Sequence, residues 1–591
     1  MENGSAQRAE ANLLRLLIEI HHICKKKYMR IIECIPNISE GRDQGKINAI
    51  VSVVESVEGV MLLDVDPGKS TNRTVITFAG EPERVVEAAF LLIQKAAELI
   101  DMRTHKGEHP RQGATDVCPF VPIAGVSMEE CVALAHQLGA RVGNELGIPG
   151  YFYEAAARQD NRRNLANCRK GEYEALEKIT TAEWKPDFGP AQITDTAKRA
   201  GITTIGARNF LVAYNVNLNT TSTRRANAIA FDIREAGRTL REGDPLTGKP
   251  ILDENGEPKR IPGTLKSVKG IGWYIDEYGI AQLSLNLTDI SVTPVHIAFE
   301  EACTKAAERG IRVTGSELVG LIPLQAMLDA ADYFLNKQER SLGISDKEKI
   351  KIAVKSLGLD DLAPFHPEEK IIEYVLAKKM GSAEKLISMT AKDLANETAS
   401  ESPAPGGGSV SAYVAALGAS LGVMVANLSS HKRGWDEQWK SFSDVAERGM
   451  KIQKELLWLV DEDTRAFNKI MEAFGLPKDS EEEKKNRAAA IESASQYAME
   501  IPMRTAVVAY QAMDICAEMI ERGNPNSVTD AGVGVLCIRA AVLGAIMNVR
   551  INAAGIKDKG FTEKLLAQAL QLESEVLERE EALRKKVMEK M

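Results

Sequence analysis

The spacing of apolar residues changes near residues 377–381, and this change divides the 591-residue chain into two parts. Before it, short apolar runs that alternate in steps of two are separated by segments with helical spacing, as in an α/β fold. After it, every long apolar segment has a helical period. A chain of this length is also too long for one hydrophobic core. The sequence therefore predicts a multidomain protein, with an N-terminal α/β part followed by a C-terminal all-α helical bundle.

The N-terminal part contains two similar series of predicted elements. The first series has strands at 30–35, 60–65, 74–79, 117–123 and 151–154, and helices at 44–57, 82–100 and 127–146. The second has strands at 210–218, 268–275, 281–286 and 311–314, and helices at 222–241, 294–309 and 324–336. Two β-α-β-β-α-β-like halves predict a ligand cleft between them. The Gly- and Pro-rich residues 243–263 predict a long surface excursion, for which a hairpin is one form.

The C-terminal part shows only helical patterns. Helices are expected at 383–396, 409–428, 438–474, 480–499, 503–522, 528–554 and 563–588. Gly418 and Gly422 lie four residues apart on one helix face, which indicates close packing against a neighbour. The uncharged run 409–428 is rich in Ala, Gly, Ser and Val and has no aromatic belt, so a buried helix is favoured over a membrane span.

Charge and cysteine content narrow the class of protein. The formal net charge of −9 argues against general binding to nucleic acid or to a membrane surface. The 8 cysteines are scattered and form neither CxxC pairs nor Cys/His clusters. No disulfide framework or metal site is therefore expected, and free thiols favour a cytoplasmic protein. No secretory signal is recognisable near the N-terminus.

A dense group of polar side chains lies at residues 101–120, which read DMRTHKGEHPRQGATDVCPF. Two of the protein's 8 histidines, His105 and His109, lie there four residues apart. Glycines and a proline oppose a regular helix, and an apolar run follows directly. Polar groups on an irregular loop beside a buried strand indicate a site, and histidine titrates near neutral pH. A solvated loop without chemistry is the alternative.

Asp64 and Asp66 alternate with apolar residues at the end of a predicted strand. A strand places side chains two residues apart on one face, so both carboxylates are expected on the same side. Asn72 and Arg73 follow in the turn. A polar strand exit with an Asx turn is the alternative interpretation.

Asp463 falls on the apolar stripe of the predicted helix 438–474. An acid on an apolar face is desolvated, which raises its pKa toward useful values. Asp461 is expected to face elsewhere and to pair with Arg465, four residues on. A buried Asp satisfied by hydrogen bonds is the alternative for Asp463.

A glycine-rich loop precedes the predicted helix 409–428. Its glycines allow close backbone approach, and the unpaired amides at a helix start suit an anionic group. A simple interdomain hinge is the alternative.

Several motifs resemble one known family. RTHKGEHPRQGATDVCPFVP, ECIPNISEG and LLDVDPGKSTNRTV resemble glutamate formiminotransferase, and SPAPGGGSV and DEDTRAF resemble formiminotetrahydrofolate cyclodeaminase. The chain is therefore similar to the bifunctional formiminotransferase-cyclodeaminases over roughly residues 30–590. The resemblance, together with the change of pattern, places an extension at 1–29, transferase subdomains at 30–206 and 207–376, a linker at 377–381 and the cyclodeaminase at 382–591.

The resemblance also implies residue roles. It implies that His109 is the general base of the transferase, with Asp66 as the paired carboxylate, and that Asp463 moves a proton in the cyclodeaminase. His105 matches a family position but is the weaker candidate. Substrate or folate contacts are expected at Asp64, Asn72, Arg73, Arg111, Gly189, Pro190, Gly406, Gly407, Gly408 and Ser409.

The activity that this resemblance implies has two steps in histidine degradation. A formimino group passes from N-formimino-L-glutamate to tetrahydrofolate, and 5-formimino-tetrahydrofolate then closes to 5,10-methenyl-tetrahydrofolate with release of ammonia. Tetrahydrofolate, in polyglutamylated form, is the expected cosubstrate, without a metal, and a homo-oligomer built on dimers of the helical domain is expected. One alternative is a glutamate formyltransferase fused to a methenyl-tetrahydrofolate cyclohydrolase. The other is a non-catalytic folate-binding scaffold.

Overall fold

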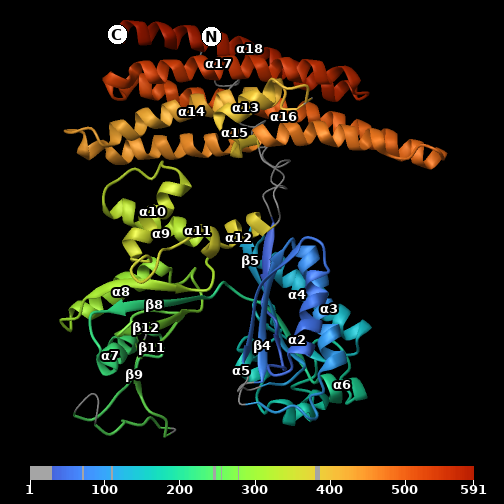
Figure 1. Cartoon of the computed structure of the whole chain (residues 1–591), viewed down its shortest axis with the longest axis vertical. Helices are drawn as coiled ribbons and strands as arrows, with labels where there is room; N and C mark the ends of the chain where they lie inside the picture. Colours follow the sequence, from blue (N-terminus) through green and yellow to red (C-terminus); the bar gives the residue numbers. More distant parts are fainter. Residues whose placement is uncertain are drawn as a thin grey trace. The chain divides into compact units, whose positions relative to one another are not determined.

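The computed structural model describes residues 30–68, 72–107, 111–243, 248–254, 256–276, 278–379, 386–402 and 404–591. The extension 1–29 and part of the predicted linker lie outside these residues. The chain forms two compact units (Figure 1). One takes Met1–Ala326 and Gly358–Gly381, and the other takes Met327–Leu357 and Ser382–Met591. The first carries α/β sheets and the second is helical, which confirms the predicted fold class.

The first sheet has the strand order β1-β4-β2-β5-β7-β6, with β3 paired to β4. Its strands are β1 (Ile31–Cys34), β2 (Asn37–Ile38), β3 (Val60–Gly68), β4 (Arg73–Gly80), β5 (Thr115–Ala124), β6 (Gly150–Glu154) and β7 (Thr203–Ala207). The β5-β7-β6 pairings are parallel and the others antiparallel. The helices α2 (Gln44–Glu55), α3 (Pro82–Leu99) and α4 (Met128–Glu145) share one apolar core with this sheet.

The second sheet is antiparallel, with the order β11-β12-β8-β13. Its strands are β8 (Val212–Leu218), β11 (Val268–Ile275), β12 (Ile280–Leu287) and β13 (Val313–Val319), and the helices α7 (Thr223–Ile233) and α8 (Val295–Ala307) belong to the same half. The close approach of α7 to β11 requires Gly272, where a Cβ would lie 2.3 Å from the backbone nitrogen of Asn227.

The predicted helix 222–241 was wrong in its second half, because α7 ends at Ile233. Arg234 has an extended backbone, and Gly237 has φ +58°, a left-handed conformation that favours glycine. The chain then enters β9 (Arg238–Thr239), which pairs with β10 (Arg260–Ile261). The described part of the excursion 243–263 is therefore carried by a hairpin.

The helical unit is built from long helices that pack side by side (Figure 1). They are α14 (Gly407–Ser430), α15 (Trp439–Gly475), α16 (Glu481–Arg522), α17 (Val528–Asn552) and α18 (Lys559–Lys590), preceded by the short α13 (Ala391–Thr398). A Cβ at Gly418 would lie 2.9 Å from the carbonyl oxygen of Gly534 on α17, and one at Gly422 would lie 3.0 Å from Ile515 on α16. The predicted packing role of both glycines is confirmed.

The helix α16 is continuous, although the sequence predicted two helices at 480–499 and 503–522. Pro502 lies inside it and has no N–H to donate to the carbonyl of Ala498. The side-chain amide of Asn552 donates a hydrogen bond of 2.7 Å to that carbonyl instead. The replacement donor from α17 explains why the helix continues through the proline.

A segment between the two α/β stretches of the chain packs with the helical unit. It contains most of α9 (Leu324–Lys337) and all of α10 (Asp346–Leu357). Between them, the hydroxyl of Ser341 donates to the side chain of Asn427 on α14 at 2.6 Å. A Cβ at Gly343 would lie 2.2 Å from that of Ala446 on α15, so the backbones are in close contact. The chain then returns to the α/β unit through α11 (Pro367–Lys370) and α12 (Ile372–Lys379).

Two helical segments in the described chain have the length and apolarity of a membrane span, Gly407–Ser430 and Pro525–Gly555. Inside the structure, 61% of the most apolar window of the first and 44% of that of the second are buried. Burial of this extent agrees with the predicted core helix at 409–428.

Candidate active sites

His109 and its two neighbours lie outside the described residues, so its role as general base stays a prediction. The other histidine of the loop, His105, is held in place. Its Nε2 lies 2.9 Å from the carbonyl oxygen of Asn72, and its Nδ1 lies 3.4 Å from Nε of Arg111. The guanidinium can only donate, so Nδ1 accepts and Nε2 carries the proton. Burial lowers the pKa of His105, which favours this neutral imidazole.

Asn72 links three sequence motifs through hydrogen bonds of its side chain. Its side-chain oxygen accepts from the backbone N–H of Gly41 at 3.0 Å, and its amide donates to the carbonyl of Lys106 at 3.0 Å. The residue is buried and has φ +49°, a left-handed conformation that asparagine tolerates better than most residues. The sequence predicted a substrate contact here; the contacts that the structure describes organise the loops around the site.

Arg73 lies at the start of β4 and contacts the buried carboxylate of Asp116 at 2.9 Å. Its Nε also donates to the side chain of Asn37 at 2.9 Å. Asp116 lies at a β-bulge, because Asn37 pairs with Val117 while the next residue of β2 pairs with Thr115. A bulge turns a side chain out of the regular alternation. Burial lowers the pKa of Arg73, and Asp116 opposes this effect.

Arg111 is held by two carboxylates that the sequence analysis missed. It makes two parallel hydrogen bonds of 2.8 Å to Glu174 and one of 2.9 Å to Glu172. Its bond to Glu174 is the largest cause that raises the pKa of Arg111 and lowers that of Glu174. The positive charge of Arg111 is thus compensated within the protein.

The partners missed by the sequence analysis all lie in one irregular segment, residues 160–180. It contains the one-turn helix α5 (Leu165–Cys168), and Arg169 follows directly. Arg169 contacts Asp116 at 2.5 Å. The only sequence feature that pointed to these partners was the charged run RKGEYE at 169–174. Charged runs are common on protein surfaces, and the residues that pair with this run lie more than 50 residues away in the sequence.

Asp64 and Asp66 both lie on β3 and are exposed on the same side of this edge strand. They pair across the ladder with Thr77 and Val75 of β4. The two carboxylates thus share one face of the strand, as predicted, and both are accessible to a ligand. The catalytic part of Asp66 stays a prediction.

Gly189 has φ +76°, and a Cβ there would lie 2.3 Å from the carbonyl oxygen of Ile148. A glycine is therefore required by packing alone. The folate contact expected of Gly189 and Pro190 stays a prediction.

Glu33 is a buried acid that the sequence analysis did not single out. It lies in the short strand β1 and is only 3% exposed, and its Oε2 has no hydrogen-bond partner among the described residues. Burial raises the pKa of Glu33 to about 7, although Arg208 opposes this effect. A carboxyl with this pKa titrates near neutral pH.

The second site forms where α15 meets the start of α14. The hydroxyl of Ser409 donates to the carbonyl of Val460 at 2.8 Å and lies 3.2 Å from Oδ2 of Asp463. A Cβ at Gly408 would lie 2.2 Å from Oδ1 of Asp463. Burial raises the pKa of Asp463, while hydrogen bonds from Ser409 oppose this effect. The anion at this helix start is thus the protein's own carboxylate. Gly406 forms the N-cap of α14, and Gly407 lies beside Asn548 of α17.

The expectation that Asp461 faces away from the packed surfaces of its helix was wrong. It is 8% exposed, and Arg465 forms its ion pair with Glu462 at 2.7 Å. The reason is that α15 packs against both α14 and α16, so more than one of its faces is buried. Glu462 is itself fully buried and accepts a hydrogen bond from the hydroxyl of Tyr497 on α16.

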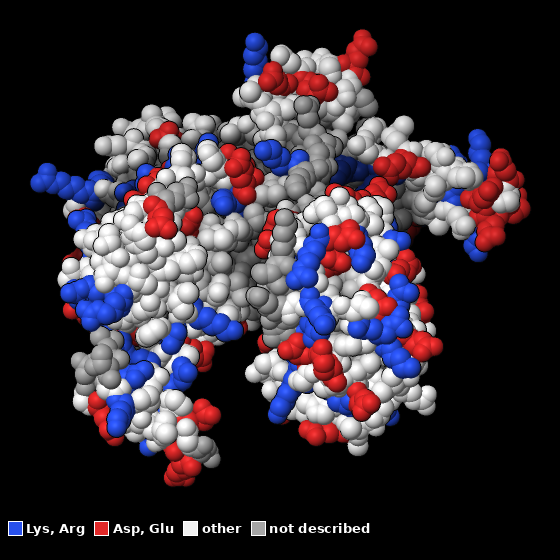
Figure 2. Space-filling model, turned by 60° about the horizontal axis from the view of Figure 1, so that its bottom comes forward, with Lys and Arg blue, Asp and Glu red and all other residues white. Residues whose placement is uncertain are grey.

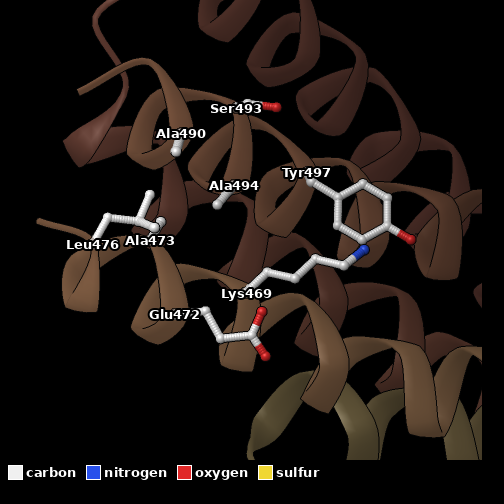
Figure 3. Close-up of a pocket in the computed structure, with 8 residues that line it drawn as sticks. All are labelled: Lys469, Glu472, Ala473, Leu476, Ala490, Ser493, Ala494 and Tyr497. Carbon is white, nitrogen blue, oxygen red and sulfur yellow. The ribbon is translucent and has the colours of Figure 1, made fainter. Parts of the chain in front are cut away.

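A cavity of about 490 Å³ lies between the same two helices, α15 and α16. Its lining residues are Lys469, Glu472, Ala473, Leu476, Ala490, Ser493, Ala494 and Tyr497. Figure 3 shows the ammonium group of Lys469 beside the ring of Tyr497, with Glu472, Leu476 and four small side chains around the rest of the space. The ammonium lies 3.9 Å from the ring centroid, a cation–π contact. No pattern in the sequence predicted this cavity.

Charged side chains are interspersed over the face shown in Figure 2, with no large area of one sign. Among the residues that the structure describes, no three His, Cys, Asp or Glu side chains are grouped as metal ligands.

Two unlike folds that each carry a candidate site define a fused enzyme with two active centres. Family models identify which one. A "Formiminotransferase domain, N-terminal subdomain" matches residues 31–208, a "Formiminotransferase domain" matches 213–377, and "Formiminotransferase-cyclodeaminase" matches 390–571. Formimidoyltransferase-cyclodeaminase of Gallus gallus is 44% identical, over 90% of this chain and 94% of the relative. The chain belongs to the formimidoyltransferase-cyclodeaminase family.

Two shorter relatives each match part of the chain. Glutamate formimidoyltransferase of Thermoplasma acidophilum is 43% identical over 52% of this chain and 93% of its own length. Methenyltetrahydrofolate cyclohydrolase of Methylorubrum extorquens is 37% identical over 29% of this chain and 82% of its own length.

Proposed function

We propose that this protein is a bifunctional folate enzyme of histidine degradation. The α/β unit transfers the formimino group of N-formimino-L-glutamate to tetrahydrofolate. The helical unit cyclises 5-formimino-tetrahydrofolate to 5,10-methenyl-tetrahydrofolate and releases ammonia. The observation that carries this proposal is family membership over nearly the full length of both units, with a separate polar site in each.

In the transfer step, N5 of tetrahydrofolate attacks the formimino carbon and loses a proton. The bond from that carbon to the nitrogen of glutamate breaks, and this nitrogen accepts the proton and leaves as the amine of glutamate. We assign His109 as the base, since an imidazole near its own pKa suits this task. Asp66 stabilises the positive charge that develops on the formimino group, and its exposure on β3 leaves it accessible. His105 keeps a fixed neutral form and positions the loop through Asn72 and Arg111.

In the cyclisation step, N10 attacks the formimino carbon, loses its proton and displaces the amidine nitrogen as ammonia. The formimino group enters as its protonated amidinium, N5–CH=NH2+. The carboxylate of Asp463 takes the proton from N10 and passes it to the departing nitrogen, which leaves as NH3, and the positive charge of the amidinium stays on the methenyl bridge. The raised pKa of Asp463 supports this role, because a general acid–base works best with a pKa near the working pH. Ser409 and Gly408 fix the position of its carboxyl group.

The homo-oligomer is proposed to form through the helical unit in the cytoplasm. Large apolar side chains of α14 are exposed at heptad-like spacing: Val410, Leu417, Met424 and Leu428. A solvent-exposed apolar stripe of this kind is typical of a protein interface. Charged substitutions at Leu417 and Met424 should reduce the size measured by analytical ultracentrifugation.

The deciding experiment supplies wild-type protein with polyglutamylated tetrahydrofolate and formiminoglutamate. Methenyl-folate absorbance and ammonia release should rise together. A parallel reaction with formylglutamate tests the alternative of a formyltransferase fused to a cyclohydrolase. This alternative is tested because part of the chain is similar to a methenyltetrahydrofolate cyclohydrolase. Turnover of formylglutamate without ammonia would reject the proposal, and no turnover of either donor would favour a folate-binding scaffold.

A further inference from the structure

Positive side chains converge on one buried carboxylate beside the signature loop. Oδ2 of Asp116 accepts from Nη1 of Arg73 at 2.9 Å and from Nη2 of Arg169 at 2.5 Å. Its other oxygen accepts from the backbone N–H of Gln112 at 3.0 Å. Two guanidinium groups therefore share one carboxylate, and the three side chains together keep a formal charge of +1.

A third cation lies close to this group. The ammonium of Lys178 donates to the carbonyl of Cys168 at 2.6 Å and lies 3.4 Å from the side-chain oxygen of Gln112. Burial lowers the pKa of Lys178 to about 8, and Asp116 opposes this effect. Among the residues that the structure describes, the charged groups nearest to Asp116 thus sum to a positive charge, which is unfavourable in a largely buried place.

Arg169 also has an unused donor. Its side chain is 14% exposed, and its Nε is buried and has no hydrogen-bond partner among the residues that the structure describes. A buried donor without a partner costs free energy, so it marks a place where a ligand acceptor is missing. Arg111 provides the contrast, since two glutamates occupy its guanidinium.

The local backbone fixes Arg169 in this position. The side chain of Asn164 caps the short helix α5, and the backbone N–H of Arg169 bonds to the carbonyl of Leu165 at 3.0 Å. The carbonyl of Arg169 then accepts from the N–H of Glu172 at 2.7 Å. Hydrogen bonds on both sides hold the backbone, and Asp116 holds the side chain, so the guanidinium is preorganised.

We infer that Arg169, together with Arg73, binds a carboxylate of a glutamyl group, with Asp116 as the residue that positions both guanidiniums. This inference rests on the proposed function, because both substrates carry glutamyl carboxylates. A planar guanidinium matches a carboxylate in a two-point contact, and the positive excess supplies the charge that such a ligand neutralises. Arg169 thus binds the glutamyl end of the substrate. Asp66 and His109 act on the formimino group.

The test uses Arg169→Met and Arg169→Lys in the full chain, with Arg163→Met as the matched control. Arg163 lies on the same segment, but its side chain is 62% exposed and pairs with Asp160. Calorimetric titration with L-glutamate, the product of transfer, gives a readout that needs no turnover. In Arg169→Met, glutamate binding should weaken about 10- to 100-fold, and Arg169→Lys should lie between it and the wild type.

Amide analogues and steady-state kinetics identify the carboxylate. If the donor carboxylate is bound, KM for formiminoglutamate rises with little change in kcat, and Arg169→Met no longer distinguishes glutamate from either glutamine or isoglutamine. If the folate glutamyl carboxylate is bound, KM for tetrahydrofolate rises instead, and the wild-type advantage of tetrahydrofolate over tetrahydropteroate disappears. Either result supports the inference.

Unchanged glutamate affinity and unchanged KM values for both substrates in a folded Arg169→Met or Arg169→Lys protein would overturn it. Failure of the proposed function looks different: the wild type would bind glutamate through Arg169 but produce no formimino-folate. Loss of stability alone, with both KM values unchanged, would show that Arg169 only compensates Asp116.

Discussion

The two candidate sites use opposite means to control charge. The α/β site lies on irregular loops and contains many ionised groups, with Arg73, Arg111 and Arg169 each bound to carboxylates of the protein. In the helical site one half-buried acid, Asp463, contacts small residues at the start of α14. The comparison teaches that a network of charges suits recognition of charged substrates, whereas burial of a single acid suits tuning of its pKa.

The backbone explains why each site can work in its own way. Loops place side chains from distant segments around a ligand, and they supply donors in many directions. Two packed helices can point side chains at a ligand from few directions, but their backbones can approach closely. Gly408 permits the α14 backbone to contact Asp463. Charge substitutions should therefore change binding at the first site, and substitutions of the single acid should change rate at the second.

The largest expected effect is at the α/β site. His109→Asn should reduce formimino transfer about 10²–10⁴-fold, because the general base is lost. Ammonia release from supplied 5-formimino-tetrahydrofolate should persist, since the helical site has its own acid. Both steps are measured separately, with the exposed His366→Asn as control. Loss of both steps in a folded variant would break the division into two independent sites.

Asp463→Asn should reduce cyclodeaminase turnover about 10²-fold or more, while transfer continues and 5-formimino-tetrahydrofolate accumulates. The amide keeps the shape and most hydrogen bonds but cannot carry the proton. Asp444→Asn is the control on the same helix, because its side chain is 57% exposed. Asp461 would be a poor control, since it is buried. Equal cyclodeaminase rates in the two folded variants would reject Asp463 as the proton carrier.

The α/β unit also contains a buried acid, Glu33. An acid with a pKa raised by burial is therefore not a property of the helical site alone. The pKa of Glu33, about 7 in the folded protein, lies above the ordinary value of 4.5 for a glutamate side chain. The native state therefore holds the proton more tightly, and stability should fall as pH rises from about 4.5 to 7. In Glu33→Gln this loss of stability should be absent, so the free energy of unfolding should rise by up to about 3 kcal/mol at pH 8. At pH 4.5 the substitution should change the free energy of unfolding little.

Differential scanning calorimetry of the α/β transition at both pH values measures this effect. Glu58→Gln, an exposed change in the same unit, serves as control. A Glu33→Gln stabilisation that is the same at both pH values would disprove the raised pKa.

The smallest effect concerns α16, which carries Tyr497, and its contact with α17. Asn552→Ala should destabilise the helical unit by about 1 kcal/mol, because the carbonyl of Ala498 loses its donor. In a Pro502→Ala background the backbone N–H of residue 502 can replace it, so the same change should cost much less. A double-mutant cycle by urea denaturation measures the coupling. Additive effects of the two changes would contradict the compensation.

Regular elements could be predicted from the sequence, and long-range partners could not. Strands such as β11 (Val268–Ile275) follow from local alternation, and the partial burial of Asp463 follows from helical spacing, because both signals lie within one element. The pairing of Arg169 with Asp116 spans 53 residues and depends on a bulge that no local pattern indicates. The continuity of α16 depends on a side chain of another helix.

The path of the chain between the units also affects how the protein comes apart. Residues 327–357 belong with the helices, the chain then returns to the α/β unit, and it leaves again at Ser382. A protease that cuts near residue 380 would therefore cleave the backbone, but the N-terminal and C-terminal fragments would not separate. Helices α9 and α10 of the N-terminal fragment would stay docked on α14 and α15 through contacts such as Ser341 to Asn427. The fragments should migrate together on a native gel and separate only in denaturant.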